Sequence, residues 1–269
     1  MKPKKSLGQH FLKSKDAILK IIRAGEISRD DIILEIGPGK GILTQELLKR
    51  VNPAQNGRGK VIAVEKDREL FEFLQNKFEK EISEKKLILI NEDILNLKIE
   101  NLKLKIYKVI SNIPYNITGA ILKKFLTEKY QPERMVLLVQ YEVAKRIMAR
   151  DSKESILSIS VKAYGAPELI GKVPRRYFSP EPKVDSAIIA IKNISRKNFM
   201  TPPFPLPLAR GGPERGEDKF WEIVKKGFAH KRKKLSGNLK NVVSAEKIAD
   251  FGDKRAEDLT LNDWIFLAR

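Results

Sequence analysis

The sequence Ser-Asn-Ile-Pro-Tyr at positions 111–115 combines groups that could hold an amine for alkylation. An adenine amine is a poor nucleophile because its nitrogen lone pair is delocalised into the ring. The side-chain oxygen of Asn112 and the backbone carbonyl of Ile113 could accept hydrogen bonds from the two N–H groups of this amine. The nitrogen could then pyramidalise towards a sulfonium methyl group. Pro114 fixes its own φ at about −65° and disfavours helical geometry at Ile113, which sets the carbonyl direction. Tyr115 offers a ring on which an extruded base could stack. An ordinary Asn-x-Pro turn after a strand is the alternative.

A glycine-rich turn earlier in the chain suggests the methyl donor. The segment ILEIGPGKGILT (33–44) predicts a buried strand, a tight turn and the start of a helix. Gly37, Gly39 and Gly41 can adopt positive φ and have no Cβ to keep a ligand from the backbone. Their spacing differs from the G-x-G-x-x-G of dinucleotide-binding folds, and no clear phosphate-binding lysine-serine pair follows. The turn therefore suits S-adenosylmethionine, and Glu35 fits a cationic ligand. Other α/β proteins also carry glycine-rich first turns.

Two carboxylates follow the next two predicted strands. Glu65 ends VIAVE, where it could accept hydrogen bonds from both ribose hydroxyls, as the acidic residue does in dinucleotide folds. Asp93 lies just past the strand LILI, where it could accept from the adenine amino group of the cofactor. A surface role for Glu65 and a helix N-cap role for Asp93 are the alternatives. Ligand-type residues at the ends of successive strands favour a binding site, because open α/β sheets bind ligands there.

These residues require a scaffold that ends several strands at one edge. Short apolar runs predict strands at 32–36, 61–65, 87–90, 107–110, 135–140 and 186–191. Apolar residues at helical spacing lie between them, at 41–51, 68–78, 119–130 and 141–150. Such alternation implies right-handed crossovers, so we expect a doubly wound α/β fold with a mostly parallel sheet covered on both faces.

The alternation stops after Ile191. Residues 192–218 are dense in proline and glycine and predict a linker or surface insertion without regular structure. The proline-rich part at 199–216 could instead bind a partner as a polyproline II segment. A helical pattern resumes at Lys219. We therefore expect a methyltransferase domain at 1–191, the linker at 192–218 and a small helical domain at 219–269.

The composition indicates which kinds of partner and ligand the protein can bind. The chain has 269 residues, with 53 Lys and Arg against 34 Asp and Glu, and its net charge of +19 suits a polyanion such as nucleic acid. A general lysine bias is the alternative. Cysteine is absent and only two histidines occur, so neither disulfides nor a metal site are expected. No apolar stretch approaches the roughly 20 residues that span a bilayer, and the N-terminus has no signal-peptide core, which predicts a cytoplasmic protein without membrane contact.

Five motifs together resemble the KsgA/RsmA family of small-subunit ribosomal RNA adenine dimethyltransferases. They are KKSLGQHFL near the N-terminus, EIGPGKG, NIPYNI, FSPEPKVDSAI (178–188) and FAHKRKKLSGNL near the C-terminus, and the resemblance runs nearly end to end. It implies a Rossmann-like class I methyltransferase domain with a mostly parallel seven-stranded sheet and a small helical C-terminal domain. It also implies four methyl transfers from S-adenosylmethionine to two adjacent adenosines in a 3′-terminal hairpin of 16S rRNA, and a role in ribosome biogenesis. We expect a monomer.

The resemblance also implies roles for single residues. The cofactor pocket would be lined by His10, Leu12, Gly37, Gly39, Glu65, Asp93 and Asn112. The catalytic set would be Asn112, Ile113, Pro114, Tyr115 and Phe178, with Phe178 on a loop as the second wall of a base sandwich opposite Tyr115. His10 stands where many members carry Asn, and Ile113 replaces the commoner Leu, which leaves the backbone carbonyl in place.

Three basic stretches are candidates for RNA contact, although each alone is also typical of a solvated surface. They contribute Lys4, Lys5, Arg175, Arg176, Lys231, Arg232, Lys233 and Lys234.

Two other functions share parts of this pattern of motifs. An Erm-type enzyme acting on large-subunit rRNA would carry NIPY, but the N-terminal, late and C-terminal motifs favour the small-subunit enzyme. A non-catalytic RNA-binding assembly factor would keep the fold and lose the glycine turn, Glu65 or Asn112, all of which are present.

Overall fold

The computed structural model describes residues 3–4, 7–52, 59–199 and 213–269. The chain forms two compact units, which are described separately. The first comprises Met1–Ala144 with Pro167–Ile194, and the second comprises Lys145–Ala166 with Ser195–Arg269. In the part of the chain that the structure describes, no helix is long and apolar enough to cross a membrane.

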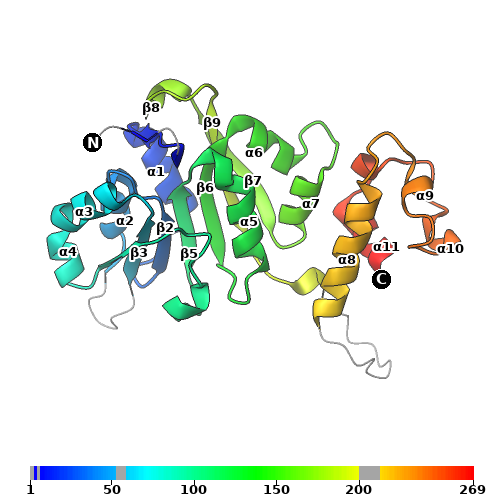
Figure 1. Ribbon diagram of the computed structural model, residues 1–269, viewed down its shortest axis with the longest axis horizontal. Coiled ribbons are helices and arrows are strands. Elements are labelled where there is room, and N and C mark those ends of the chain that lie inside the picture. Colours follow the sequence, from blue (N-terminus) through cyan, green and yellow to red (C-terminus); the bar gives the residue numbers. More distant parts are fainter. Residues whose placement is uncertain (1–2, 5–6, 53–58, 200–212) are drawn as a thin grey trace. The chain divides into compact units, whose positions relative to one another are not determined.

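A seven-stranded sheet organises the first unit (Figure 1). Its order is β4-β3-β2-β5-β6-β9-β7, and the five strands from β4 to β6 run parallel, whereas β9 runs antiparallel to β6. The strands are β2 (Ile32–Ile36), β3 (Lys60–Glu65), β4 (Leu87–Asn91), β5 (Lys108–Asn112), β6 (Arg134–Gln140), β7 (Ala166–Val173) and β9 (Ser186–Lys192). The expected mostly parallel α/β sheet is confirmed.

The strand β7 is absent from the sequence-based prediction. It lies at the edge of the sheet, and most of its residues are exposed or half-buried, so its sequence APELIGKV has no continuous apolar run. Pro167 lies within it, which an edge strand tolerates because an edge residue need not donate to a neighbour.

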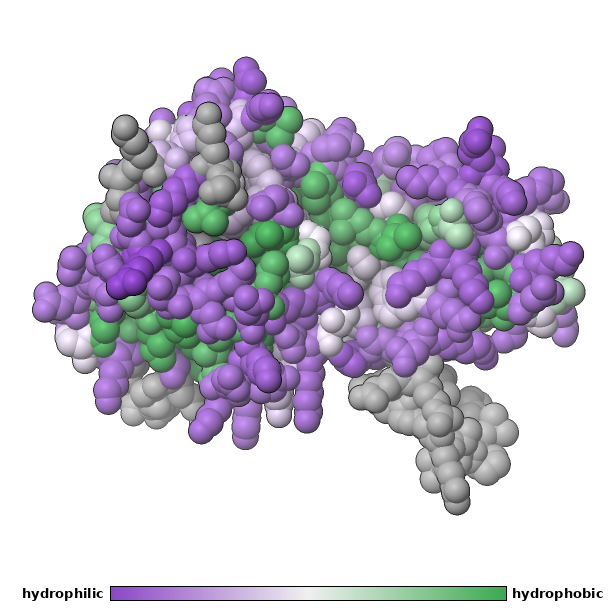
Figure 2. All heavy atoms as spheres, in the orientation of Figure 1, coloured by the Kyte–Doolittle hydropathy of each residue, from purple (hydrophilic) through white to green (hydrophobic). Residues whose placement is uncertain are grey.

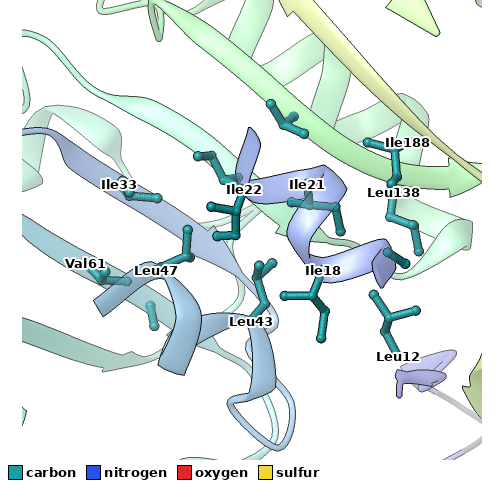
Figure 3. Packing of buried hydrophobic residues seen from close by; sticks show 14 of the residues in the cluster. Leu12, Ile18, Ile21, Ile22, Ile33, Leu43, Leu47, Val61, Leu138 and Ile188 are labelled. Carbon is teal, nitrogen blue, oxygen red and sulfur yellow. The ribbon is translucent and has the colours of Figure 1, made fainter. Parts of the chain in front are cut away.

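Helices cover the sheet on both faces. They are α1 (Lys15–Ala24), α2 (Ile42–Leu48), α3 (Arg68–Lys77), α4 (Glu79–Ser83) and α5 (Thr118–Thr127), whereas α6 (Tyr141–Met148) begins in the first unit and ends in the second. Figure 3 shows Ile18, Ile21 and Ile22 of α1 packed in one cluster with α2 and with strand residues such as Leu138 and Ile188. The alternate residues Leu137 and Ile189 point to the opposite face and are also fully buried. Each such side chain contributes roughly 1.5–3 kcal/mol by burial.

The second unit is helical and has an aromatic core. It contains α7 (Ile156–Lys162), α8 (Pro213–Gly227), α9 (Leu235–Asn238), α10 (Ala245–Ile248) and α11 (Leu261–Ala268). Tyr164 stacks against Trp221 with ring centroids 6.3 Å apart and contacts Phe199 at 5.1 Å. The hydroxyl of Tyr164 donates a hydrogen bond to Glu217. The Glu154 amide also donates to the Glu257 carbonyl oxygen at 2.7 Å, so residues 145–166 contact the C-terminal part of this unit near both Glu154 and Tyr164.

The domain boundaries predicted at 191 and 219 stay a prediction, but the linker is shorter than expected. Helix α8 begins at Pro213, so residues 213–218 are helical rather than irregular. Proline fits there because its missing N–H is not needed in the first turn of a helix. The proline-rich segment predicted at 199–216 falls mostly outside the described residues, which resume only at 213.

Candidate active site

A cavity of about 180 Å³ opens in the first unit at the carboxyl ends of β2 to β5. An N-terminal segment, residues 7–12, supplies part of its lining. The cavity brings together ten of the residues predicted for the cofactor and catalytic sites: His10, Leu12, Gly37, Gly39, Glu65, Asp93, Asn112, Ile113, Pro114 and Tyr115. Glu35 also lines it. The topology explains this convergence, because parallel neighbouring strands end at the same edge of a sheet.

Phe178 lies apart from this lining. It is 2% exposed and belongs to the hydrophobic core of the first unit. The residue lies in the short strand β8 (Phe178–Ser179), which pairs antiparallel with β1 (Phe11–Leu12), rather than on a loop as expected. Prolines flanking the motif obscured this pairing. Its part in a base sandwich stays a prediction.

The glycine turn needs its glycines. Gly37, Gly39 and Gly41 have φ of 65°, 59° and 73°, in the left-handed region. A Cβ on Gly41 would come within 2.5 Å of the Phe78 ring, and a Cβ on Gly39 would lie 3.0 Å from the Phe11 ring. Gly41 is therefore needed for packing, whereas Gly37 and Gly39 line the cavity and leave the backbone there without side chains, which permits the close approach of a ligand.

Glu65 ends β3 with both carboxylate oxygens bonded to the backbone. Its Oε2 accepts a hydrogen bond from the Gly39 amide at 3.1 Å, and its Oε1 accepts from the Asp67 amide at 2.9 Å. The residue is 5% exposed, and this burial raises the pKa of the carboxyl, although the two amide bonds oppose the rise. Glu65 thus links the glycine turn to the start of α3 while it lines the cavity.

Asp93 makes both a capping bond and an ion pair. Its Oδ1 accepts from the Leu95 amide at 3.0 Å, so it caps the turn that follows β4. Its Oδ2 lies 2.8 Å from Lys66 Nζ, and this bond, more than any other contact, lowers the pKa of the carboxyl. The capping alternative and a place in the cavity lining are therefore both observed.

Glu35 is the buried acid of the cavity. It is 1% exposed, and its Oε2 has no hydrogen-bond partner among the described residues. Burial raises the pKa of this carboxyl to about 8, and the charge of Glu65 adds to the rise, whereas the neighbouring Thr44 hydroxyl opposes it. A positively charged ligand group beside Glu35 would favour its ionised form.

Asp67 ties the N-terminal segment to the cofactor side, a role that the sequence analysis missed. Its Oδ1 lies 2.8 Å from Lys4 Nζ, and its Oδ2 accepts from Gln9 Nε2 at 3.0 Å. Burial raises the pKa of Asp67, but the bonds from Lys4, Gln9 and the Glu69 amide outweigh it and lower the pKa overall. A helix N-cap pattern at Asp67, two residues after Glu65, was the available signal.

Asn112 ends β5 and is oriented by the N-terminal segment. Its Nδ2 donates to the backbone carbonyl of His10 at 3.3 Å. That bond uses the nitrogen end of the amide and leaves the oxygen end for an acceptor role. Pro114 has φ of −59° and ψ of 133°, as expected for a residue that fixes the chain direction after Ile113.

Tyr115 is held by one contact on the face of its ring and by another at its hydroxyl. The His10 ring is stacked on it, with centroids 5.8 Å apart and an interplanar angle of 19°. His10 Nδ1 lies 2.8 Å from the Pro180 carbonyl oxygen. The Tyr115 hydroxyl is 2.5 Å from Ser186 Oγ, and burial raises the pKa of the phenol, which keeps it neutral. Thr118 begins α5.

The basic stretches differ in how many of their basic side chains already form ion pairs or ring contacts within the protein. Lys4 pairs with Asp67 and Glu69, and Arg175 pairs with Glu181 at 2.9 Å. Arg176 lies over the Tyr177 ring, and Lys234 pairs with Asp253. Lys231, Arg232 and Lys233 are exposed, whereas Lys5 lies outside the described residues. Hydrophilic side chains cover most of the surface seen in Figure 2. RNA contact by these residues stays a prediction.

Comparison with known proteins places the chain in a family. The family described as ribosomal RNA adenine dimethylase matches residues 1–264. A ribosomal RNA small subunit methyltransferase A from Dehalococcoides mccartyi is 36% identical over 275 residues, covering 98% of this chain and 87% of the relative.

Two solved structures share the fold over almost the whole chain. A dimethyladenosine transferase from Plasmodium falciparum has a TM-score of 0.76 at 25% identity, covering 96% of both chains. The 23S rRNA methyltransferase ErmE has a TM-score of 0.73 at 24% identity, covering 96% of this chain and 98% of its own, which shows the fold alone. The expected methyltransferase fold, S-adenosylmethionine cofactor and dimethyltransferase class are confirmed. The chain belongs to the ribosomal RNA adenine dimethylase family.

Proposed function

We propose that this protein dimethylates two adjacent adenosines in a 3′-terminal hairpin of small-subunit (16S) rRNA. The observation that carries the proposal is the shared cavity: residues 112–115, predicted to hold the target amine, and Gly37, Gly39 and Glu65, predicted to bind the cofactor, line the same space. The relative from Dehalococcoides mccartyi, named a small subunit methyltransferase, favours small-subunit over large-subunit rRNA.

The residues of the cavity fit S-adenosylmethionine. The left-handed glycines leave the backbone accessible, and Glu35 offers a buried carboxylate oxygen without a partner in the described chain, suited to a cationic ligand. Glu65 would hold the ribose and Asp93 the adenine, with His10 and Leu12 closing the pocket from the N-terminal segment. When bound, S-adenosylmethionine supplies the electrophilic methyl group.

The chain's own residues orient the target amine. The Asn112 side-chain oxygen and the Ile113 carbonyl accept hydrogen bonds from its two N–H groups. These bonds turn the nitrogen lone pair out of conjugation with the ring. Tyr115 stacks on the extruded base. After the first transfer the amine keeps a single hydrogen, so only one of the two acceptors still has a partner. The second transfer therefore depends more on stacking than the first does.

We infer that the exposed Lys231, Arg232 and Lys233 contribute to binding the rRNA backbone. Replacing all three by Glu should weaken rRNA binding by more than about tenfold and flatten its salt dependence, because each lost phosphate contact lowers the slope by about one unit. Unchanged binding and slope would remove this cluster from the interface. We also propose that the protein acts in the cytoplasm as a monomer and takes part in small-subunit biogenesis.

Methyl transfer from labelled S-adenosylmethionine to undermethylated ribosomal subunits tests the function. Label should appear on adenosines of small-subunit rRNA. Label confined to large-subunit rRNA would instead indicate an Erm-type enzyme. Intact S-adenosylmethionine binding without any transfer would indicate a non-catalytic assembly factor.

A further inference from the structure

The hydroxyl of Tyr115 has a partner that base stacking does not require. A phenylalanine would stack equally well, yet the Tyr115 hydroxyl lies 2.5 Å from the hydroxyl of Ser186. Ser186 is fully buried and begins β9, at the end of the FSPEPKVDSAI motif. We propose that Ser186 is a positioning residue, which fixes the tip of the Tyr115 side chain, and so the direction in which the ring projects, through this hydrogen bond. The inference rests on the proposed function, in which Tyr115 stacks on the target base.

The topology of the sheet brings these two residues together. Strand β9 runs antiparallel to β6, so it starts at the edge where the parallel strands β5 and β6 end. In the register of the sheet Ser186 is the partner of Gln140, the last residue of β6. Its hydroxyl therefore lies at the edge where Asn112 ends β5 and the cavity opens.

The backbone that leads into Ser186 is held in place. The Tyr141 amide donates to the Asp185 carbonyl oxygen at 3.0 Å. The Asp185 side chain accepts from the Arg175 amide at 2.9 Å and lies 2.8 Å from Lys172 Nζ. Because the neighbouring residue is anchored by its backbone and by its side chain, Ser186 is a fixed point for the Tyr115 ring.

A bond at the tip of the ring restrains the first side-chain torsion of Tyr115, whereas the His10 ring stacked on Tyr115 restrains the second, which sets the ring plane. The chain enters Tyr115 from Pro114, whose φ is fixed, so the ring is held at its base and at its hydroxyl. Stacking only helps the reaction if the base plane places the amine at the Asn112 and Ile113 oxygens. Ser186 thus acts on the reaction through Tyr115, without contact to the base.

A double-mutant cycle on turnover tests this pair. Ser186→Ala and Tyr115→Phe should each lower kcat about fivefold to tenfold, because each removes the same hydrogen bond. The double variant should fall no further than either single variant, within about twofold. The dissociation constant for S-adenosylmethionine should stay within about twofold of the wild type in all three proteins.

Two matched controls separate positioning from general loss of stability. Tyr107→Phe removes a buried hydroxyl that donates to the Tyr130 carbonyl oxygen at 2.9 Å, just before the opposite end of β5. Ser160→Ala removes a hydroxyl that donates to the Leu157 carbonyl oxygen within α7. Both controls should keep wild-type kcat.

A wild-type kcat in Tyr115→Phe or in Ser186→Ala would overturn the inference, as would losses that multiply in the double variant. If Ser186→Ala does not fold, Tyr115→Phe decides alone, because it removes the bond from the cavity side. A wild-type protein that methylates no adenosine would refute the proposed function, which is a separate result from an equal kcat in wild type and variants.

Discussion

The two halves of the cavity, which we propose bind the cofactor and the target base, contain different kinds of side chain. The cofactor half contains the carboxylates Glu65 and Asp93, which already bond to the Gly39 and Asp67 amides and to Lys66. The target half contains neutral groups: the Asn112 amide, the Ile113 carbonyl and the Tyr115 phenol. Carboxylates provide strong binding to hydroxyls and amines, whereas fixed neutral dipoles favour a particular reacting geometry. Changes in the first half should therefore alter affinity, and changes in the second should alter turnover.

Removal of the stacking ring should lower turnover strongly. Tyr115→Ala is expected to lower kcat about 100-fold, since stacking on an aromatic ring is worth ~1–3 kcal/mol per base and alignment is lost as well. Steady-state methylation of small-subunit rRNA measures this. Tyr130→Ala is a suitable control, because Tyr130 is a half-exposed aromatic outside the cavity lining. A similar loss in both variants would mean that Tyr115 acts through stability.

Neutralising Glu65, the carboxylate that we propose binds the ribose of the cofactor, should affect cofactor binding rather than turnover. Glu65→Gln is expected to raise the dissociation constant for S-adenosylmethionine about 30-fold, because hydrogen bonds to a charged acceptor are worth ~1.5–3 kcal/mol. Turnover at saturating cofactor should fall by less than about threefold. Calorimetric titration and rates at high cofactor concentration distinguish the two. A loss confined to kcat would contradict the division of the cavity into two halves.

Loosening the N-terminal segment should have a smaller effect of the same kind. Asp67→Asn weakens the bonds to Lys4 and Gln9, so residues 7–12 should close less well over the cofactor. We expect an increase of about fivefold in the dissociation constant for S-adenosylmethionine. Glu69→Gln is the matched control: it also removes a bond to Lys4, but the Glu69 side chain is 62% exposed and should contribute little. Equal effects of both variants would show that Asp67 does not organise the segment.

Glu35 should affect the stability of the protein through pH. Its pKa is about 8 in the folded protein against an ordinary value of 4.5, so the folded state keeps a proton that the unfolded state releases between these values. Stability should therefore fall as pH rises through this window, because the unfolded state binds fewer protons there. Glu35→Gln abolishes this loss and should raise Tm by about 5 °C at about pH 9, with little change at about pH 5. Melting curves without cofactor measure this, and a constant difference between the proteins would contradict it.

Much of the scaffold and of the cofactor half could be predicted from the sequence. Strands such as β2 and β3 are continuous apolar runs, and the residues just after them are ligand types, so their convergence follows from parallel pairing. Edge strand β7 was missed because its residues are half-exposed. The helical start of α8 was not predicted, because residues 213–218 still contain the proline and glycine that indicated a linker.

The supporting contacts could not be predicted, because they depend on register and on long-range packing. Tyr115 and Ser186 are 71 positions apart, and Lys4 and Asp67 are 63 apart. No local sequence pattern predicts either contact. The burial of Phe178 likewise depends on the pairing of β8 with Leu12, which its proline-rich surroundings conceal. Sequence motifs therefore indicated the reacting groups better than the residues that hold them.

The acceptor role of Asn112 is the centre of this account. Mapping the methylated nucleotides of small-subunit rRNA after reaction with the wild type and with Asn112→Ala tests it directly. The wild type should dimethylate two adjacent adenosines near the 3′ end. The variant should leave both unmodified at matched times, with kcat reduced by about 10²–10³, while its affinity for S-adenosylmethionine stays within about threefold. Full dimethylation by Asn112→Ala would contradict the role given to the amide oxygen.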